Sequence, residues 1–232
     1  MTQDAKAQTI DNWWGDSTEY EALMEDEHTP QWLQMIDLMS EEDITQKSVL
    51  DFGCNQGGFL RLLYLKKPYK KATGVDIAAQ TIAQATERSA AIPAEFIVSA
   101  DITQNGLEEQ FDLCFSNEVV YLLPDIQKHA NDIQSVLKKG GVYYLSISSH
   151  TDNPMWPRWK EMIEKESAVT VQNYSLTDIS DAFIAAGLYV SARPFKPEGF
   201  LPVSQSNEWF RTPQEVFEYY YRQKVLFRIE KP

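Results

Sequence analysis

Five short apolar runs alternate with helical segments between residues 48 and 149, and this alternation constrains the fold more than any other feature of the sequence. Each run is rich in β-branched or aromatic residues and has the length of a buried strand. The runs are SVLDFG (48–53), KATGVDI (71–77), AEFIVSA (94–100), FDLCFSN (111–117) and GVYYLSISS (141–149). Strands that alternate with helices over short loops are parallel and joined by right-handed crossovers, so the pattern predicts a doubly wound α/β sheet.

Three of the connecting segments carry apolar residues at helical spacing. They are GGFLRLLYLKK (57–67), AAQTIAQATERSA (78–90) and PDIQKHANDIQSVLKKG (124–140). In the last of them, Pro124 occupies a first-turn position and Gly140-Gly141 marks the end, which is the usual start and stop chemistry of a helix. Residues 102–110 are too few and too polar to predict a helix.

Two further regions flank this core. Near the N-terminus, TPQWLQMIDLM predicts a helix with Thr29 as N-cap and Pro30 in the first turn, and Leu33, Ile36 and Met39 share the face that packs on the sheet. After His150, the sequence predicts an inserted helical segment, a helix ending at Gly187, and two closing strands with a helix between them (153–167, 176–187, 188–195, 212–223 and 224–232).

These elements predict one domain over residues 1–232. Its parts are a helical N-terminal lid (1–45), a cofactor-binding core (46–150), a cap insertion after the fifth strand (151–175), and closing helices and strands (176–232).

Composition and charge argue against several classes of protein. No run of about 18 apolar residues suggests a membrane span, and the N-terminus has no secretory pattern. Cys54 and Cys114 suggest no disulfide framework, so a cytoplasmic protein is expected, and the cysteines and histidines lack the spacing of a metal site. The formal net charge of −13 argues against a nucleic-acid partner, because an acidic surface repels phosphates.

The turn after the first predicted strand is a candidate cofactor site. It reads Gly53-Cys54-Asn55-Gln56-Gly57-Gly58, so Asn55 replaces the central glycine of the dinucleotide fingerprint. Asparagine tolerates a left-handed backbone better than most residues, and the turn can still form. Asp51 lies two residues before Gly53, where a carboxylate would repel a pyrophosphate. It suits a cofactor that carries an ammonium group and a sulfonium.

Acidic residues also end the next two predicted strands. Asp76 in GVDIA could accept both hydroxyls of a ribose in a bidentate arrangement. Asp101 in SADIT could accept a hydrogen bond from the amino group of an adenine, or it could simply cap a turn.

Together these segments resemble the motifs of class I S-adenosylmethionine-dependent methyltransferases, of the Rossmann-like group that acts on small molecules. The resemblance lies in VLDFGCNQGG, GVDIA, SADIT, FDLCFSNEVVYLLPD and LKKGGVYYLSIS, which follow the family's order over about residues 48 to 149. It implies a mostly parallel seven-stranded sheet and S-adenosylmethionine as cofactor, with S-adenosylhomocysteine as product. It also implies methyl transfer to N or O of a small organic acceptor.

The resemblance further implies that the cofactor is bound by residues at the strand ends and in the turns that follow. For the methionine portion and the transferable methyl these are Asp51, Gly53, Asn55, Gly57 and Asn117. For the ribose and adenine they are Asp76, Ile77, Asp101 and Ile102.

Candidate catalytic residues follow the fourth strand. A base is needed only if the acceptor is protonated or weakly acidic, because the cofactor brings its own electrophile. Many members of the family have a histidine where this chain has Leu122. The remaining candidates are Glu118, Tyr121 and His150, and of these Glu118 and Tyr121 could equally serve only to cap and pack.

Aromatic residues suggest a lid and an acceptor pocket. Trp14 and Tyr20, with Trp13, could close over the cofactor, and an acceptor pocket could be lined by Trp156, Trp159, Trp209 and Phe210. Such residues are also common in cores. An acidic, aromatic pocket would favour a cationic or flat acceptor.

Three other functions remain open. One is methylation of protein or RNA, which the negative charge disfavours. Another is a non-catalytic S-adenosylmethionine-binding module, which Leu122 permits. The last is a nicotinamide-dependent dehydrogenase, which Asp51 opposes by its charge. The sequence does not predict an oligomeric state.

Overall fold

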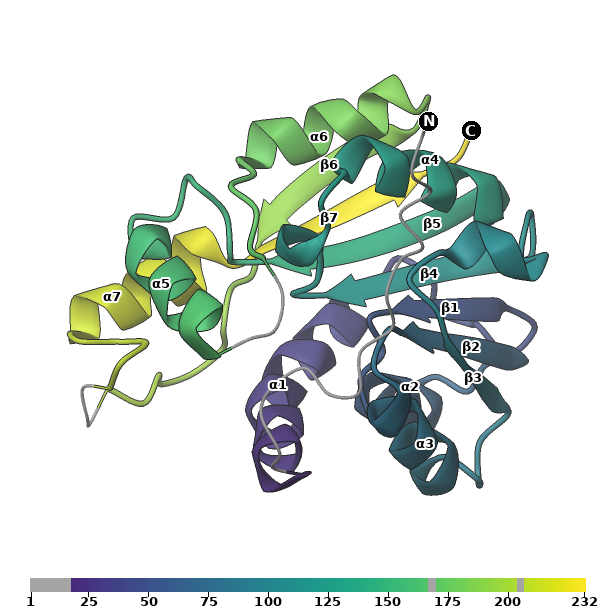
Figure 1. Ribbon diagram of the computed structural model, residues 1–232, viewed down its shortest axis with the longest axis horizontal. Helices are drawn as coiled ribbons and strands as arrows, with labels where there is room; N and C mark the ends of the chain where they lie inside the picture. The colour runs from purple at the N-terminus through teal and green to yellow at the C-terminus, as the bar shows by residue number, and fades with distance from the viewer. Residues whose placement is uncertain (1–17, 167–169, 204–206) are drawn as a thin grey trace, which may run out of the picture.

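The computed structural model describes residues 18–166, 170–203 and 207–232, and its centre is a seven-stranded sheet in the order β3-β2-β1-β4-β5-β7-β6 (Figure 1). The strands are β1 (Ser48–Phe52), β2 (Lys71–Asp76), β3 (Ala94–Val98), β4 (Phe111–Asn117), β5 (Leu137–Ile147), β6 (Tyr189–Pro194) and β7 (Val225–Glu230). The first five are parallel, and β7 runs antiparallel to both β5 and β6. The predicted doubly wound, mostly parallel sheet is confirmed.

The strand order places a switch point between β1 and β4. These two strands are neighbours, although β2 and β3 separate them in the chain. Helices that leave adjacent strands in opposite directions open a crevice at the carboxyl ends of those strands. Asp51 lies in β1 next to Phe115 of β4, so it stands at the edge of this crevice.

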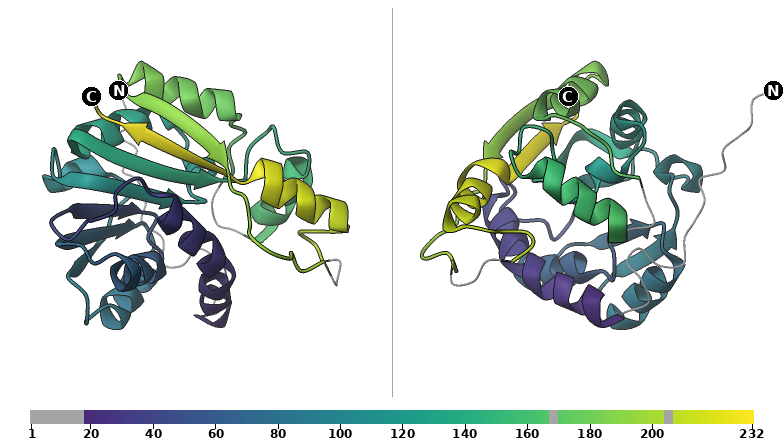
Figure 2. Two further views of the ribbon diagram at one scale, coloured as in Figure 1. Left: turned by 180° about the vertical axis from the view of Figure 1, so that it is seen from behind. Right: turned by 60° about the vertical axis from the view of Figure 1, so that its left-hand side comes forward.

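Side chains on successive strand positions enter two different cores. In β1, Val49 packs in the core that α1 (Thr18–Leu38) and α2 (Gly58–Lys66) cover. The next residue, Leu50, packs in the core that α4 (Ile126–Val136) and α6 (Leu176–Ala185) cover. This alternation is expected of strands buried on both faces. Figure 2 shows the sheet lying between α6 on one side and α1 with α2 and α3 (Ala79–Arg88) on the other.

The N-terminal helix begins earlier than the sequence predicts. Pro30 lies inside α1, and Thr29 is not its N-cap, because the Thr29 hydroxyl donates to the carbonyl of Glu25 at 2.8 Å. Proline removes one helical hydrogen bond. The helix nevertheless continues through this position, with Met35 and Ile36 fully buried against the sheet and Met39 nearly so, while Leu33 is only half-buried.

The boundary between α4 and β5 also differs from the prediction. Asp125, not Pro124, begins the helix, because its carboxylate accepts from the backbone N–H of Lys128. The helix ends at Val136, and the strand begins at Leu137, which is fully buried and pairs with Phe111. Gly140-Gly141 therefore lies inside the strand, where the register against β4 shifts.

The cap lies beyond the carboxyl end of β5. It is larger than the predicted insertion over 151–175, because besides α5 (Trp156–Glu166) it contains α7 (Pro213–Glu218) and the π-helical turn that follows (Tyr219–Gln223). Figure 1 shows α5 and α7 together on one side of this end of the sheet, with α1 on the other. Short 3₁₀ turns follow β3 and β4 at Ile102–Asn105 and Val120–Leu122. Over the part of the chain that the structure describes, no helix has the length and apolar character needed to cross a membrane.

Candidate active site

A cavity opens where β1, β2 and β4 end, and α1 forms its outer wall. Seven of the predicted site residues line it: Asp51, Gly53, Asn55, Asp76, Asn117, Glu118 and Tyr121. The wall from α1 consists of Glu25, His28 and Trp32. The structure therefore brings the strand ends together as predicted and adds a helical face that was not predicted.

The turn after β1 adopts the conformation that its residues permit. Gly53, Asn55 and Gly57 all have positive φ, at 75°, 46° and 74°. The prediction that Asn55 tolerates a left-handed backbone is confirmed. At Gly53 a Cβ atom would lie 2.3 Å from a methyl group of Val119, so both the backbone and the close approach require glycine.

Asp76 ties this turn to the start of α3. One carboxylate oxygen accepts from the backbone N–H of Asn55 and the other from that of Ala78, both at 3.0 Å. The carboxylate is buried yet still lines the cavity. It therefore supports the turn at the edge of the cavity.

Asp51 lies beside Asp76, and this proximity makes the cavity electrostatically unusual. Burial, followed by the nearby charge of Asp76, raises the pKa of Asp51 to about 8. None of the described residues that line the cavity is a lysine or arginine. A bound cation would therefore compensate the two acids and favour the ionised form of Asp51.

Five predicted site residues lie outside the lining of this cavity. Gly57 turns the backbone, and Ile77 and Ile102 are half-buried and buried, respectively. Asp101 caps the 3₁₀ turn through Thr103 and forms an ion pair with Lys128 at 3.3 Å. His150 is fully buried and bonds through Nε2 to the carbonyl of Gln223 at 2.9 Å.

Two of the predicted lid residues lie outside the described residues, namely Trp13 and Trp14. Tyr20 lies in α1, but its side chain is outside the described part. The α1 wall has a recognisable signal in the sequence, because positions 25, 28 and 32 have the spacing of one helical face. The sequence predicted a helix that begins at Thr29-Pro30, so positions 25 and 28 were left outside the predicted helix and this face was missed.

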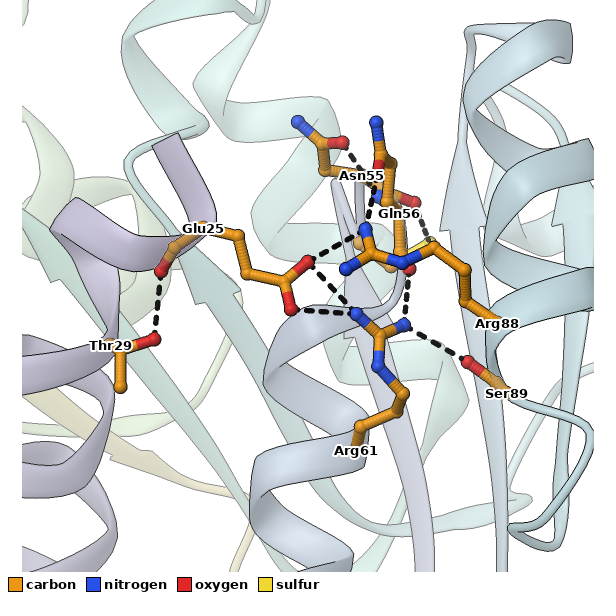
Figure 3. A network of polar contacts seen from close by, with 8 residues as sticks. Glu25, Thr29, Asn55, Gln56, Arg61, Arg88 and Ser89 are labelled. Atoms are coloured by element: carbon orange, nitrogen blue, oxygen red, sulfur yellow. Dashed lines mark hydrogen bonds and ion pairs between the residues drawn. The ribbon is translucent and has the colours of Figure 1, made fainter. Parts of the chain in front are cut away.

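A polar network holds α1 to the turn after β1 (Figure 3). Both oxygens of Glu25 accept from the same Arg61 nitrogen, at 2.7 and 2.8 Å, and Arg88 approaches to 2.9 Å. Arg61 also donates to the carbonyl of Gln56 at 2.6 Å, and Arg88 bonds the Gln56 side chain. The network thus links α1, α2 and α3 to the turn.

A second cavity adjoins the first, with a volume of about 490 Å³. The two share His28, Glu118 and Tyr121 as lining residues. The cap supplies an aromatic wall made of Trp159, Trp209, Phe210, Tyr219 and Tyr220. Three of the residues predicted for an acceptor pocket therefore line this cavity, whereas Trp156 is buried in the core beside Tyr121.

Comparison with known proteins identifies the family. A model of the methyltransferase domain matches residues 45–209. The chain belongs to the S-adenosylmethionine-dependent methyltransferases. This confirms the family and the cofactor that the sequence motifs implied.

Curated relatives of this methyltransferase match part of the chain. A trans-aconitate 2-methyltransferase from Rhodopseudomonas palustris is 29% identical over 120 residues, which are 52% of this chain and 46% of the relative. A malonyl-[acyl-carrier protein] O-methyltransferase from Enterobacter lignolyticus is 31% identical over 122 residues, or 52% and 47% of the two chains. The chain spans about half the length of the curated relatives it matches.

Solved structures share the fold of this methyltransferase. A methyltransferase in complex with the Trm112 activator of Haloferax volcanii has a TM-score of 0.79 at 20% identity, covering 92% of this chain and 94% of that one. An S-adenosylmethionine-dependent methyltransferase from Listeria monocytogenes, itself described as putative in function, has a TM-score of 0.66 at 17% identity, with 89% and 98% covered.

The residues of the first cavity fit the family's cofactor. Within the described residues, the Trp32 indole N–H and the Asn117 amide nitrogen are buried without hydrogen-bond partners. These donors suit the carboxylate of the methionine portion, whereas Asp51 and Asp76 suit its ammonium and the ribose hydroxyls. The cavity thus presents donors and acids to a ligand that carries both kinds of charge.

Proposed function

We propose that this protein transfers a methyl group from S-adenosylmethionine to N or O of a small organic acceptor held in the second cavity. The observation that carries this proposal is the junction of the two cavities at His28, Glu118 and Tyr121. A transferable methyl and its acceptor must meet in line and away from water. Two adjoining cavities with a shared wall meet that requirement.

The chain's own residues have distinct roles in this proposal. When bound, S-adenosylmethionine supplies a methyl group on a sulfonium centre. Asp51 and Asp76 bind the cationic and ribose parts, Asn117 stands beside the methionine portion, and Glu118 accepts the proton that the attacking atom loses. The cap and α1 exclude water from the junction.

A small acceptor accords better with the structure than a macromolecule. One curated relative is named for trans-aconitate, a small acid, and another for malonyl-[acyl-carrier protein], an acyl group carried on a protein. The formal net charge of −13 disfavours binding to RNA, which depends on neutralising phosphates. In this chain the second cavity is lined by Glu27 and Glu118, and no lysine or arginine is among its described lining residues.

Calorimetric titration tests the cofactor half of the proposal. S-adenosylhomocysteine should bind, NAD should not, and Asp76→Ala should weaken S-adenosylhomocysteine binding at least about tenfold, because a buried charge-assisted contact is lost. Asp181→Ala, at an exposed position of α6, is the matched control and should leave the affinity unchanged. Binding of NAD without S-adenosylhomocysteine would refute the proposal.

A second measurement tests the transfer itself. Incubation with methyl-labelled S-adenosylmethionine and a library of amines, phenols and carboxylates should label at least one small acceptor. Label recovered only in protein or RNA, when these are offered at the same concentration, would instead support the macromolecular alternative.

A further inference from the structure

The second cavity has an aromatic wall held together by many ring contacts. Trp159 packs edge-on against Trp209, Phe210 and Tyr219, with ring centroids 5.7, 5.8 and 5.7 Å apart. Tyr219 in turn lies 4.7 Å from Tyr220. Such a wall presents flat faces and edges, which suit a flat ring by stacking or edge contacts.

Among the fully buried polar atoms of the residues that line this cavity, those without a partner are acceptors. Within the described residues, Gln31 Oε1 and Glu118 Oε2 are buried and have no hydrogen-bond partner, and both residues line the cavity. Two donors in the same wall are already used: the Trp159 indole N–H bonds the carbonyl of Trp209, and the Ser148 hydroxyl bonds Glu118. A buried acceptor without a donor is costly, so a ligand that supplies one is favoured.

Glu118 is held in place by its neighbours. Its backbone has a φ of 54°, and its N–H donates to the carbonyl of Ser146 at 3.0 Å. Its Oε1 atom accepts from the Ser148 hydroxyl at 2.7 Å and from the ammonium of Lys224. One oxygen is therefore fully engaged, and the other is buried without a partner in a residue that lines the cavity.

The contact between Glu118 and Lys224 also keeps both side chains charged. Burial alone would raise the pKa of Glu118, but the Lys224 ammonium and the bonds from Lys224 and Ser148 hold it below its ordinary value. The side chain of Lys224 is only 2% exposed and points its charge at Glu118, so it is not offered to a ligand. A carboxylate ligand would therefore meet Glu118 and Glu27 without a cation to bind it.

We propose that the second cavity selects a flat aromatic acceptor that donates a hydrogen bond from N–H or O–H to Glu118 Oε2 or Gln31 Oε1, and that it rejects acceptors carrying a carboxylate. This substrate class, aromatic amines and phenols, rests on the proposed function. It further makes Glu118 and Gln31 the residues that determine acceptor specificity.

The test uses full-length protein saturated with S-adenosylhomocysteine and three naphthalene probes of similar shape. They are 2-naphthol, which donates a hydrogen bond, 2-methoxynaphthalene, which cannot, and 2-naphthoate, which carries a carboxylate. Isothermal calorimetry should show 2-naphthol binding at least about tenfold more tightly than either of the others. Equal affinities, tighter binding of 2-naphthoate, or no binding of 2-naphthol would overturn the inference.

Substitutions at Glu118 and Gln31 test the contribution of each acceptor atom to ligand affinity. Glu118→Gln should remove much of the discrimination against 2-naphthoate. Because that change leaves Lys224 buried without its partner, Gln31→Leu provides an independent test, and 2-naphthol affinity should fall several-fold in at least one of the two proteins. Gln34→Leu lies on the same helix outside both sets of lining residues and should change neither affinity. Unchanged 2-naphthol binding in folded Gln31→Leu and Glu118→Gln proteins would contradict the assignment.

The two proposals fail in different ways. Absence of S-adenosylhomocysteine binding refutes the proposed function, because the cofactor site is then misassigned. Normal S-adenosylhomocysteine binding together with a preference for 2-naphthoate refutes only the substrate class.

Discussion

At the scale of single residues, Asp51 is the group whose chemistry changes most on ligand binding. Its carboxyl has a pKa of about 8 in the unliganded protein and is therefore mainly protonated at pH 7. A cationic ligand favours the carboxylate, so binding at pH 7 should release up to about one proton. Calorimetry in two buffers of different ionisation enthalpy measures this number. Asp51→Asn should release fewer protons, and identical release in both proteins would contradict the assignment.

The same residue predicts how stability depends on pH. The folded-state pKa of Asp51 is raised above its unfolded value near 4, so its contribution is fully present below pH 4 and is lost as pH rises through about 8. The free energy of unfolding of the wild type should therefore fall relative to Asp51→Asn by about 1 kcal/mol per pH unit between pH 5 and 8. Urea denaturation of both proteins across this range checks the slope. If the free energies of unfolding of the wild type and Asp51→Asn changed in parallel with pH, Asp51 would not be the source of the pH dependence.

A comparison of two glycines with left-handed backbone distinguishes the cost of backbone strain from the cost of a steric clash. Gly53 and Gly106 have φ values of 75° and 66°, but only at Gly53 would a Cβ meet another atom. Alanine at either position costs about 1 kcal/mol of backbone strain. Gly53→Ala should cost at least about 2 kcal/mol more and weaken S-adenosylhomocysteine binding, because Val119 must move. Thermal unfolding with and without ligand compares the two variants. Equal losses of stability in Gly53→Ala and Gly106→Ala would mean that Val119 moves aside at no cost in free energy.

At the scale of elements, α1 depends on the Glu25 network for its position. Glu25→Gln removes the charge that Arg61 and Arg88 share, and these side chains are only partly exposed. We expect a loss of about 1 kcal/mol in stability and faster amide exchange in α1. Hydrogen exchange followed by mass spectrometry measures this by segment. Glu164→Gln, which breaks a surface pair with Lys160 in α5, is the control and should leave α1 unchanged.

The strands could be predicted from the sequence because most are short runs rich in apolar, β-branched or aromatic residues with helical segments between them. SVLDF and FDLCFSN are buried on both faces, so neither alternation nor tertiary contacts were needed to recognise them. The site residues at their ends, Asp51, Asp76 and Asn117, followed from the strand boundaries.

Helix boundaries and the role of Glu25 could not be predicted in the same way, although the spacing of positions 25, 28 and 32 is visible in the sequence. Pro30 resembles a helix start, but the packing of Met35 and Ile36 keeps the helix continuous through it. Glu25 acquires its role only from Arg61 and Arg88, which lie on two other helices. Tertiary contacts of this kind leave no local signal in a single sequence.

At the scale of the whole molecule, ligand binding should raise stability by mass action. At a free S-adenosylhomocysteine concentration 100 times its Kd, the gain is about 2.7 kcal/mol. For a domain of this size that corresponds to an increase of roughly 5–10 °C in the unfolding temperature. Differential scanning fluorimetry measures the shift, and NAD at the same concentration should produce none. A comparable shift with NAD would point to a dinucleotide site.

Helix α1 has one further consequence, because it belongs to both cavities at once. Glu25, His28 and Trp32 face the first cavity, and Glu27, His28 and Gln31 face the second. A ligand in either cavity therefore immobilises the same helix. The second ligand then binds to a helix that has already lost its conformational entropy, so its own binding costs less free energy. By thermodynamic reciprocity, each ligand should tighten the other by the same factor. One helix with two faces thus makes the occupancy of the two sites interdependent, with no need for a change in the sheet beneath.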